Sequence, residues 1–134
     1  MRIIGGHHRG LALAAVGAGD SGAQLRPTSD RVRESLFNVL MGGRFGDPVT
    51  GAEVLDLFAG TGALGLEAIS RGAAHATFVD DGRVAAGLIR DNIARCRRQS
   101  DTRLLQVSAL KLPQAEASAT LIFLDPPYNR GLGA

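Results

Sequence analysis

Residues 53–65 read EVLDLFAGTGALG, and this stretch decides the fold. Glu53 to Phe58 has the composition of a buried strand, and the glycines at 60, 62 and 65 match G-x-G-x-x-G, the turn that leads from a strand into a helix. Asp80 lies twenty residues beyond Gly60, at the end of the next predicted strand. This spacing predicts a site for a nucleoside-containing ligand, with the acid on the ribose hydroxyls. The alternative is that the glycines only make a tight turn.

The charge beside this loop separates two ligand classes. NAD or FAD would place a pyrophosphate at the helix N-terminus, where Asp56, four residues before Gly60, would repel it. S-adenosylmethionine has no phosphate, carries a sulfonium and an ammonium group, and keeps a ribose diol for Asp80. We therefore favour S-adenosylmethionine over NAD. A purely structural role for Asp56, as a loop or helix-capping carboxylate, is the alternative.

Strands and helices alternate on the C-terminal side of residue 53. We expect strands at 53–58, 75–79, 103–107 and 120–124 and helices at 63–71 and 84–97, with a short helix after Pro113 in the ambiguous segment 110–119. Such alternation predicts an α/β fold with a parallel sheet and right-handed crossovers. The expected strand order is 3-2-1-4.

The N-terminal part has a different pattern. Residues 1–25 predict a small hairpin or arm followed by a Gly-rich connector, and 31–41 predict a helix capped by Thr28, Ser29 or Asp30. The expected buried stripe of this helix contains Val32, Leu36, Val39 and Leu40, which leaves Arg31 and Arg33 off the stripe. We divide the chain into an arm, connector and helix (1–50) and a ligand-binding core (51–134).

Composition restricts the class of protein and its partners. The formal net charge is +2, and all but one of the fifteen Lys and Arg residues are Arg. Arginine suits phosphates and bases, so nucleic acid is a reasonable partner, although a GC-rich genome would also favour Arg. No apolar run is long enough for a membrane span, no signal-peptide core is visible, and Cys96 is the single cysteine. We expect a cytoplasmic protein without a metal site.

The motif Asp125-Pro126-Pro127-Tyr128 follows the last predicted strand. Ligands of open α/β sheets bind at the carboxyl ends of the strands. A carboxylate and a backbone carbonyl there could accept both hydrogens of an exocyclic amine, and the aromatic ring could stack on the base. The alternative is a rigid turn with a surface aromatic residue.

Together with DLFAGTG at 56–62, this motif resembles the S-adenosylmethionine-dependent amino-methyltransferases. More narrowly, the chain resembles the RsmD family of bacterial 16S rRNA guanine-N2 methyltransferases. The stretches that carry the resemblance are Arg2–Gly6, Arg9–Gly10, Leu25–Asn38, Asp56–Glu67 and Asp125–Tyr128. The resemblance implies a Rossmann-like class I methyltransferase fold with an N-terminal hairpin and helix extension. It also implies further C-terminal strands, so we expect a truncated domain.

The resemblance assigns roles by position. The implied cofactor-binding residues are Asp56, Phe58, Ala59, Gly60, Thr61, Gly62, Asp80, Asp81, Ser108 and Ala109. The implied catalytic residues are Asp125, Pro126, Pro127 and Tyr128, with the Asp125 carboxylate and the Pro126 carbonyl on the guanine amine. The implied RNA-binding residues are Arg2, Arg9, Arg26, Arg31 and Arg33. Two positions depart from the family pattern: Ser108 replaces a common Asp or Asn, and Gly82 replaces a frequent Asp.

The implied partners are 16S rRNA and the small ribosomal subunit. The alternatives are an adenine-N6 nucleic-acid methyltransferase, an NAD-dependent oxidoreductase, and a truncated product that binds cofactor or RNA without turnover. A monomer is expected for the full family domain. In this shorter chain the strand at 121–124 would lie at the sheet edge, so we expect either that a partner chain covers it, as in an edge-strand dimer, or that it stays exposed with low stability.

Overall fold

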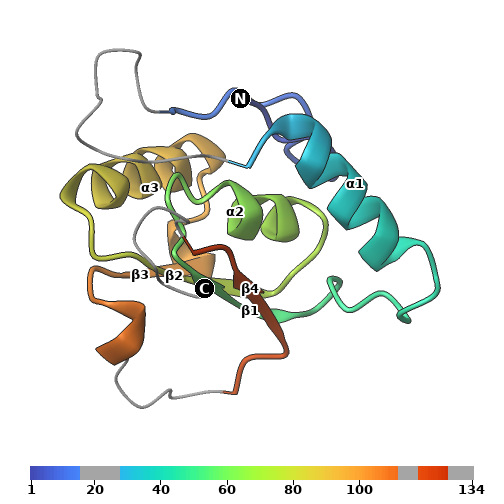
Figure 1. The fold of residues 1–134 in the computed structure, drawn as a ribbon. Coiled ribbons are helices and arrows are strands. Elements are labelled where there is room, and N and C mark those ends of the chain that lie inside the picture. Colours follow the sequence, from blue (N-terminus) through green and yellow to red (C-terminus); the bar gives the residue numbers. More distant parts are fainter. Residues whose placement is uncertain (16–27, 112–117, 127–134) are drawn as a thin grey trace.

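Four parallel strands form the centre of the fold in the order β3-β2-β1-β4 (Figure 1). The computed structural model describes residues 1–15, 28–111 and 118–126. The strands are β1 (Glu53–Leu57), β2 (His75–Val79), β3 (Thr102–Leu105) and β4 (Leu121–Leu124). Every pairing is parallel, which confirms the predicted α/β class and strand order.

The three α-helices of the described residues lie on one face of this sheet (Figure 1). They are α1 (Asp30–Met41), α2 (Ala63–Ser70) and α3 (Arg83–Cys96). Two short 3-10 helices, η2 (Gln99–Asp101) and η3 (Ala109–Lys111), precede and follow β3. The short helix predicted after Pro113, within the segment 110–119, falls mostly on residues 112–117, which lie outside the described part. None of the described helices has the length and apolar character that a membrane crossing requires.

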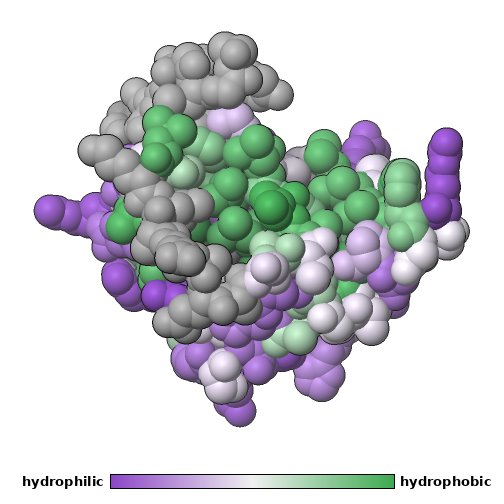
Figure 2. Space-filling model, turned by 90° about the horizontal axis from the view of Figure 1, so that it is seen from below, coloured by the Kyte–Doolittle hydropathy of each residue, from purple (hydrophilic) through white to green (hydrophobic). Residues whose placement is uncertain are grey.

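The two faces of the sheet differ in burial because strand side chains alternate. In β1, Val54 and Asp56 are buried on the helix side, whereas Leu55 and Leu57 are half-buried on the other side. The same alternation leaves Ile122 and Leu124 of β4 exposed, at 56% and 62%, while Phe123 is buried. Figure 2 shows a continuous hydrophobic surface on the side of the molecule opposite the helices. Among described residues, an apolar sheet face is therefore uncovered as well as the edge.

The core lies between this sheet and the helices. Phe78 of β2, Leu66 of α2 and Ile89 of α3 are fully buried there. Gly65 permits the close approach of α2 to β2, because a Cβ atom at this position would lie 2.4 Å from the Phe78 ring. The third glycine of the loop motif therefore serves helix–sheet packing.

The first residues form the predicted hairpin. Arg2 and Ala12 make an antiparallel bridge, and backbone hydrogen bonds join Ile3 to Leu11 (2.9 Å) and Leu13 to Met1 (2.8 Å). The side chains of Ile3 and Leu13 enter the main core. The hairpin is therefore part of the packed structure in residues 1–15, and the Gly-rich connector predicted at 17–24 falls outside the described residues.

Helix α1 begins and ends close to its predicted bounds, but the predicted buried stripe is wrong in part. Val32 and Val39 are more than half exposed, whereas Phe37 and Arg33 are buried. Phe37 packs on Phe123 of β4, with ring centroids 5.7 Å apart. The helix turns this face inward because the guanidinium of Arg33 has charged and polar partners in the interior, which periodicity alone does not reveal.

Candidate functional site

The carboxyl ends of three strands meet at one edge of the sheet. Leu57 of β1 is in register with Val79 of β2 and with Leu124 of β4. The residues that follow, Phe58, Asp80 and Asp125, therefore leave the sheet at the same level. The structure thus brings the glycine loop, the acid after β2 and the start of the Asp-Pro-Pro-Tyr motif together, as predicted for a ligand site.

The glycine loop depends on backbone conformations that favour glycine. Gly60 and Gly62 have φ angles of +61° and +82°, and Gly62 is the N-cap residue of α2. Phe58 also adopts a positive φ of 56°, a strained conformation for a bulky residue. Thr61 is buried, and its carbonyl accepts a hydrogen bond from Asn92 of α3 at 2.8 Å. A side chain of α3 therefore helps to fix the conformation of the loop.

Asp80 connects the glycine loop to the start of α3. Its Oδ2 accepts a hydrogen bond from the backbone N–H of Gly60 at 3.0 Å, and its Oδ1 accepts one from Gly82 at 2.9 Å. The carboxylate is thus oriented by two backbone donors and remains half-buried. The neighbouring Asp81 is exposed. Of the two acids, Asp80 is the one that the fold fixes beside the loop.

Asp56 lies in the interior below the loop. Its Oδ2 accepts a hydrogen bond from the backbone N–H of Gly65 at 3.0 Å, whereas its buried Oδ1 has no hydrogen-bond partner among the described residues. The pKa of Asp56 is raised to about 8, chiefly by burial; the hydrogen bond from Gly65 opposes the shift, and the nearby charges of Asp125 and Asp80 add to it. At neutral pH the carboxyl is therefore mostly protonated. The prediction that Asp56 repels phosphate assumed an ionised carboxylate and is corrected, because a mostly protonated carboxyl carries little charge. A cation bound nearby would favour the ionised form.

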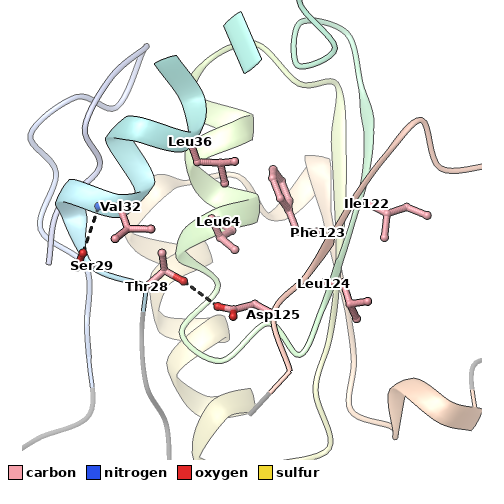
Figure 3. Close-up of a pocket in the computed structure, with 9 residues that line it drawn as sticks. All are labelled: Thr28, Ser29, Val32, Leu36, Leu64, Ile122, Phe123, Leu124 and Asp125. Carbon is pink, nitrogen blue, oxygen red and sulfur yellow. Dashed lines mark hydrogen bonds between the residues drawn. The ribbon is translucent and has the colours of Figure 1, made fainter. Parts of the chain in front are cut away.

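Asp125 follows β4 and faces the start of α1. Its Oδ2 accepts a hydrogen bond from the hydroxyl of Thr28 at 2.8 Å (Figure 3). Pro126 is half-buried, and the predicted Pro127 and Tyr128 lie outside the described residues. Beside Asp125, α1, α2 and β4 line a largely apolar pocket. Its lining residues are Thr28, Ser29, Val32, Leu36, Leu64, Ile122, Phe123, Leu124 and Asp125.

The predicted adenine-side residues follow β3. Ser108 and Ala109 are half-buried, and the Ser108 hydroxyl accepts a hydrogen bond from the backbone N–H of Leu110 at 3.2 Å. This contact forms a local turn at the start of η3. Both residues lie after the strand next to β2, and thus on the Asp80 side of the glycine loop.

The predicted RNA-binding arginines that the structure describes are either exposed or fully buried. Arg2, Arg9 and Arg31 are exposed, and Arg26 lies outside the described residues. Arg33 is instead fully buried, and its Nε donates to Glu67 at 3.2 Å. Its assignment as an RNA contact is therefore wrong, because a guanidinium without solvent exposure and with internal partners offers nothing to a phosphate.

Sequence reasoning missed Glu67 and the contact made by Thr28. Glu67 is fully buried on α2 and receives hydrogen bonds from the backbone N–H groups of Ile4 and Gly5, each at 2.9 Å. It also pairs with Arg33 and, at 2.8 Å, with Arg71. The only sequence signal was a glutamate between Leu66 and Ala68 in an otherwise apolar helix. Among the described residues, no three or more His, Cys, Asp or Glu side chains lie together so that they could hold a metal ion.

Comparison with known proteins identifies the family. A family model described as Conserved hypothetical protein 95 matches residues 1–133. The chain belongs to this family. The match bears out the RsmD-family resemblance that the sequence motifs carried.

Individual relatives of this RsmD-family chain are methyltransferases by name. Ribosomal RNA small subunit methyltransferase D of Escherichia coli is 41% identical over 133 residues, which are 98% of this chain and 62% of the relative. The putative rRNA methyltransferase YlbH of Bacillus subtilis is 39% identical over 137 residues, covering 96% of this chain and 67% of the relative. This chain thus spans just under two thirds of the length of the Escherichia coli relative.

A solved structure agrees in fold. The putative methyltransferase yhhF from Escherichia coli matches with a TM-score of 0.79 and 40% identity, covering 99% of this chain and 67% of that chain. The RsmD-family chain therefore has the Rossmann-like fold of methyltransferases, as the motifs predicted.

Proposed function

We propose that this chain carries the cofactor-binding and amine-binding residues of an rRNA methyltransferase that modifies the exocyclic N2 amine of a guanine in 16S rRNA. The observation that carries the proposal is the convergence of Asp56, Asp80 and Asp125 at the carboxyl ends of adjacent strands. Relatives whose names specify rRNA small subunit methylation support the substrate class.

The residues around the glycine loop fit S-adenosylmethionine. The unpartnered Oδ1 of Asp56 is a buried acceptor that suits a cationic donor, and a cation would favour its ionised form. The half-buried carboxylate of Asp80 would accept hydrogen bonds from the ribose hydroxyls, while Gly60, with open space where a Cβ would lie, leaves room for the ligand at the turn. When bound, S-adenosylmethionine supplies an electrophilic methyl group. Ser108 and Ala109 would border the adenine.

The end of β4 supplies the acceptors for the amine. An aryl amine is a poor nucleophile because its lone pair is delocalised into the ring. The Asp125 carboxylate and the Pro126 carbonyl would accept hydrogen bonds from its two N–H groups, favour a more pyramidal nitrogen and aim the lone pair in the direction of transfer. Such positioning supplies a large share of the rate enhancement in reactions of this kind. Tyr128 would stack on the base that carries the amine.

The exposed arginines would contact the RNA backbone. Arg2, Arg9 and Arg31 are all solvent-exposed in the N-terminal part of the chain, which also contains Thr28, the hydrogen-bond partner of Asp125. Together with Arg26 they would neutralise phosphates and orient the RNA. Binding to rRNA or to the small subunit is therefore expected to weaken steeply as salt concentration rises.

A methyl-transfer assay tests the proposal. The chain is incubated with methyl-labelled S-adenosylmethionine and 30S subunits that lack the modification, and the rRNA is then hydrolysed to nucleosides and separated. We expect labelled N2-methylguanosine with the wild type, none with Asp125→Ala, and wild-type labelling with Asp91→Ala. Asp91 is the matched control because it is an exposed acid on α3 whose partner is Arg95.

Other outcomes would identify the alternatives. Labelled N6-methyladenosine would indicate an adenine methyltransferase. Calorimetric binding of S-adenosylhomocysteine without labelling would indicate that this chain binds the cofactor without turnover. Binding of NADH in place of S-adenosylhomocysteine would contradict the proposed cofactor.

A further inference from the structure

The carboxylate of Asp125 is held by a residue from the opposite end of the chain. The hydroxyl of Thr28 donates to its Oδ2 at 2.8 Å across a sequence separation of 97 residues. In Figure 3 the two side chains point toward each other between the start of α1 and the end of β4. The Oδ1 atom of Asp125 has no hydrogen-bond partner in the described part of the chain. One oxygen is thus fixed and the other is left for a ligand.

Thr28 is itself held by a buried ion pair. Its carbonyl accepts a hydrogen bond from Nη1 of Arg33 at 3.2 Å, and Nε of the same guanidinium binds Glu67 at 3.2 Å. The side chains of Arg33 and Glu67 have no solvent exposure. Arg33 also binds Asp30 at 3.0 Å and the carbonyl of Arg2. A guanidinium with partners on all three nitrogens cannot rotate, so the position of Thr28 is fixed relative to α2.

Net stability is a weak explanation for this network. The desolvation of two buried charges can offset their attraction, so the presence of such a pair is weak evidence of a gain in the free energy of unfolding. In this chain the pair of Arg33 and Glu67 holds Thr28 next to the end of β4, where it contacts Asp125. Without that contact, an exposed aspartate at a strand end would sample several rotamers.

We propose that Thr28 is a positioning residue for Asp125 and that the buried Arg33–Glu67 pair holds Thr28 in place. The hydrogen bond from the Thr28 hydroxyl to Oδ2 of Asp125 restricts rotation of the carboxylate. Oδ1 is then presented to an N–H of the target amine. The catalytic half of this inference rests on the proposed methyl transfer. The structural half, coupling between Thr28 and Asp125, does not.

Three variants test the catalytic half in the 30S assay. Thr28→Val removes the hydroxyl at nearly constant volume, Thr28→Ser keeps it, and Thr50→Val is the control. Thr50 is a matched site because its hydroxyl also donates to an aspartate, Asp47, but in an exposed loop. We expect Thr28→Val to lower kcat about tenfold, as for loss of a hydrogen bond to a charged group, with an unchanged KM for S-adenosylmethionine. Thr28→Ser should stay within about twofold of the wild type, by the same reasoning.

Two kcat results would overturn the catalytic half. One is a kcat for Thr28→Val equal to that of the wild type. The other is failure of Thr28→Ser to restore kcat, which would indicate that the methyl group of Thr28, and not its hydroxyl, matters. A rise in KM for the cofactor at constant kcat would likewise place Thr28 in cofactor binding and contradict the inference.

A double-mutant cycle tests the contact without any activity. Urea midpoints are measured for the wild type, Thr28→Val, Asp125→Ala and the double variant. We expect Thr28→Val to lower the midpoint in the wild type but not in the Asp125→Ala background. Equal shifts in both backgrounds would overturn the contact whatever the activity. Coupling in a chain that transfers no methyl group would uphold the contact and overturn the proposed function.

Discussion

Replacing Asp56 by Asn tests whether a protonated carboxyl lies under the glycine loop. Asn keeps the shape of the side chain and an oxygen for the Gly65 N–H, but it cannot ionise. The folded-state pKa of Asp56 is about 8, against 3.8 for an ordinary aspartate in water. Between these values the native state binds a proton that the unfolded state has released, so stability must fall as pH rises.

The expected size of this effect follows from linkage. One extra proton in the native state corresponds to a slope of about −1.4 kcal/mol per pH unit, so this single group should lower the free energy of unfolding by roughly 3–4 kcal/mol between pH 5 and pH 8. That is a large share of the typical 5–15 kcal/mol stability of a domain. The Asp56→Asn variant should lack this component and should therefore be more stable than the wild type at pH 8.

Urea unfolding followed by circular dichroism at pH 5, 6, 7 and 8 measures the difference. Subtracting the variant from the wild type removes the contribution of all other titrating groups. Asp91→Asn is the control, because Asp91 is half exposed and should leave the wild-type pH dependence unchanged. Parallel pH profiles for the wild type and Asp56→Asn would refute the burial of Asp56 as a neutral acid.

Three further predictions concern packing, reactivity and association. Gly65→Ala should destabilise the chain by about 1–3 kcal/mol because the added Cβ meets the Phe78 ring. The control Gly87→Ala, in open space on α3, should stabilise it by about 0.5–1 kcal/mol in the same urea titration. Cys96 is buried, and burial raises its pKa to about 11. Iodoacetamide should therefore modify this thiol only after unfolding, as measured by mass spectrometry. Rapid modification of the native chain would contradict the burial of Cys96. Ile122→Lys should reduce the concentration-dependent association of the protein measured by light scattering, because Ile122 belongs to the uncovered apolar face of the sheet. Unchanged association would exclude this face as the cause of the association.

The sequence alone predicted the α/β class, the glycine turn and the approximate bounds of the main elements. A strand followed by G-x-G-x-x-G and an acid after the next strand is a local pattern, and with the alternation of strands and helices it predicted the parallel sheet and an acid at the glycine loop, where Asp80 meets Gly60. The strand order came with the fold that the family resemblance implies. These features follow from backbone requirements and short-range periodicity. Residues far apart in sequence but adjacent through regular crossovers are also predictable, because parallel strands end at a common edge.

The tertiary structure decided which charged side chains are interior. Periodicity placed Arg33 on the solvent side of α1, yet the structure buries it because Glu67, 34 residues away, supplies an opposite charge. It also decided that Thr28 reaches Asp125 and that Asp56 is mostly neutral at pH 7. A side chain's type and spacing are visible in the sequence. Its partners and its solvation, which set the energy of a charge, depend on distant segments and appear only when the chain is folded.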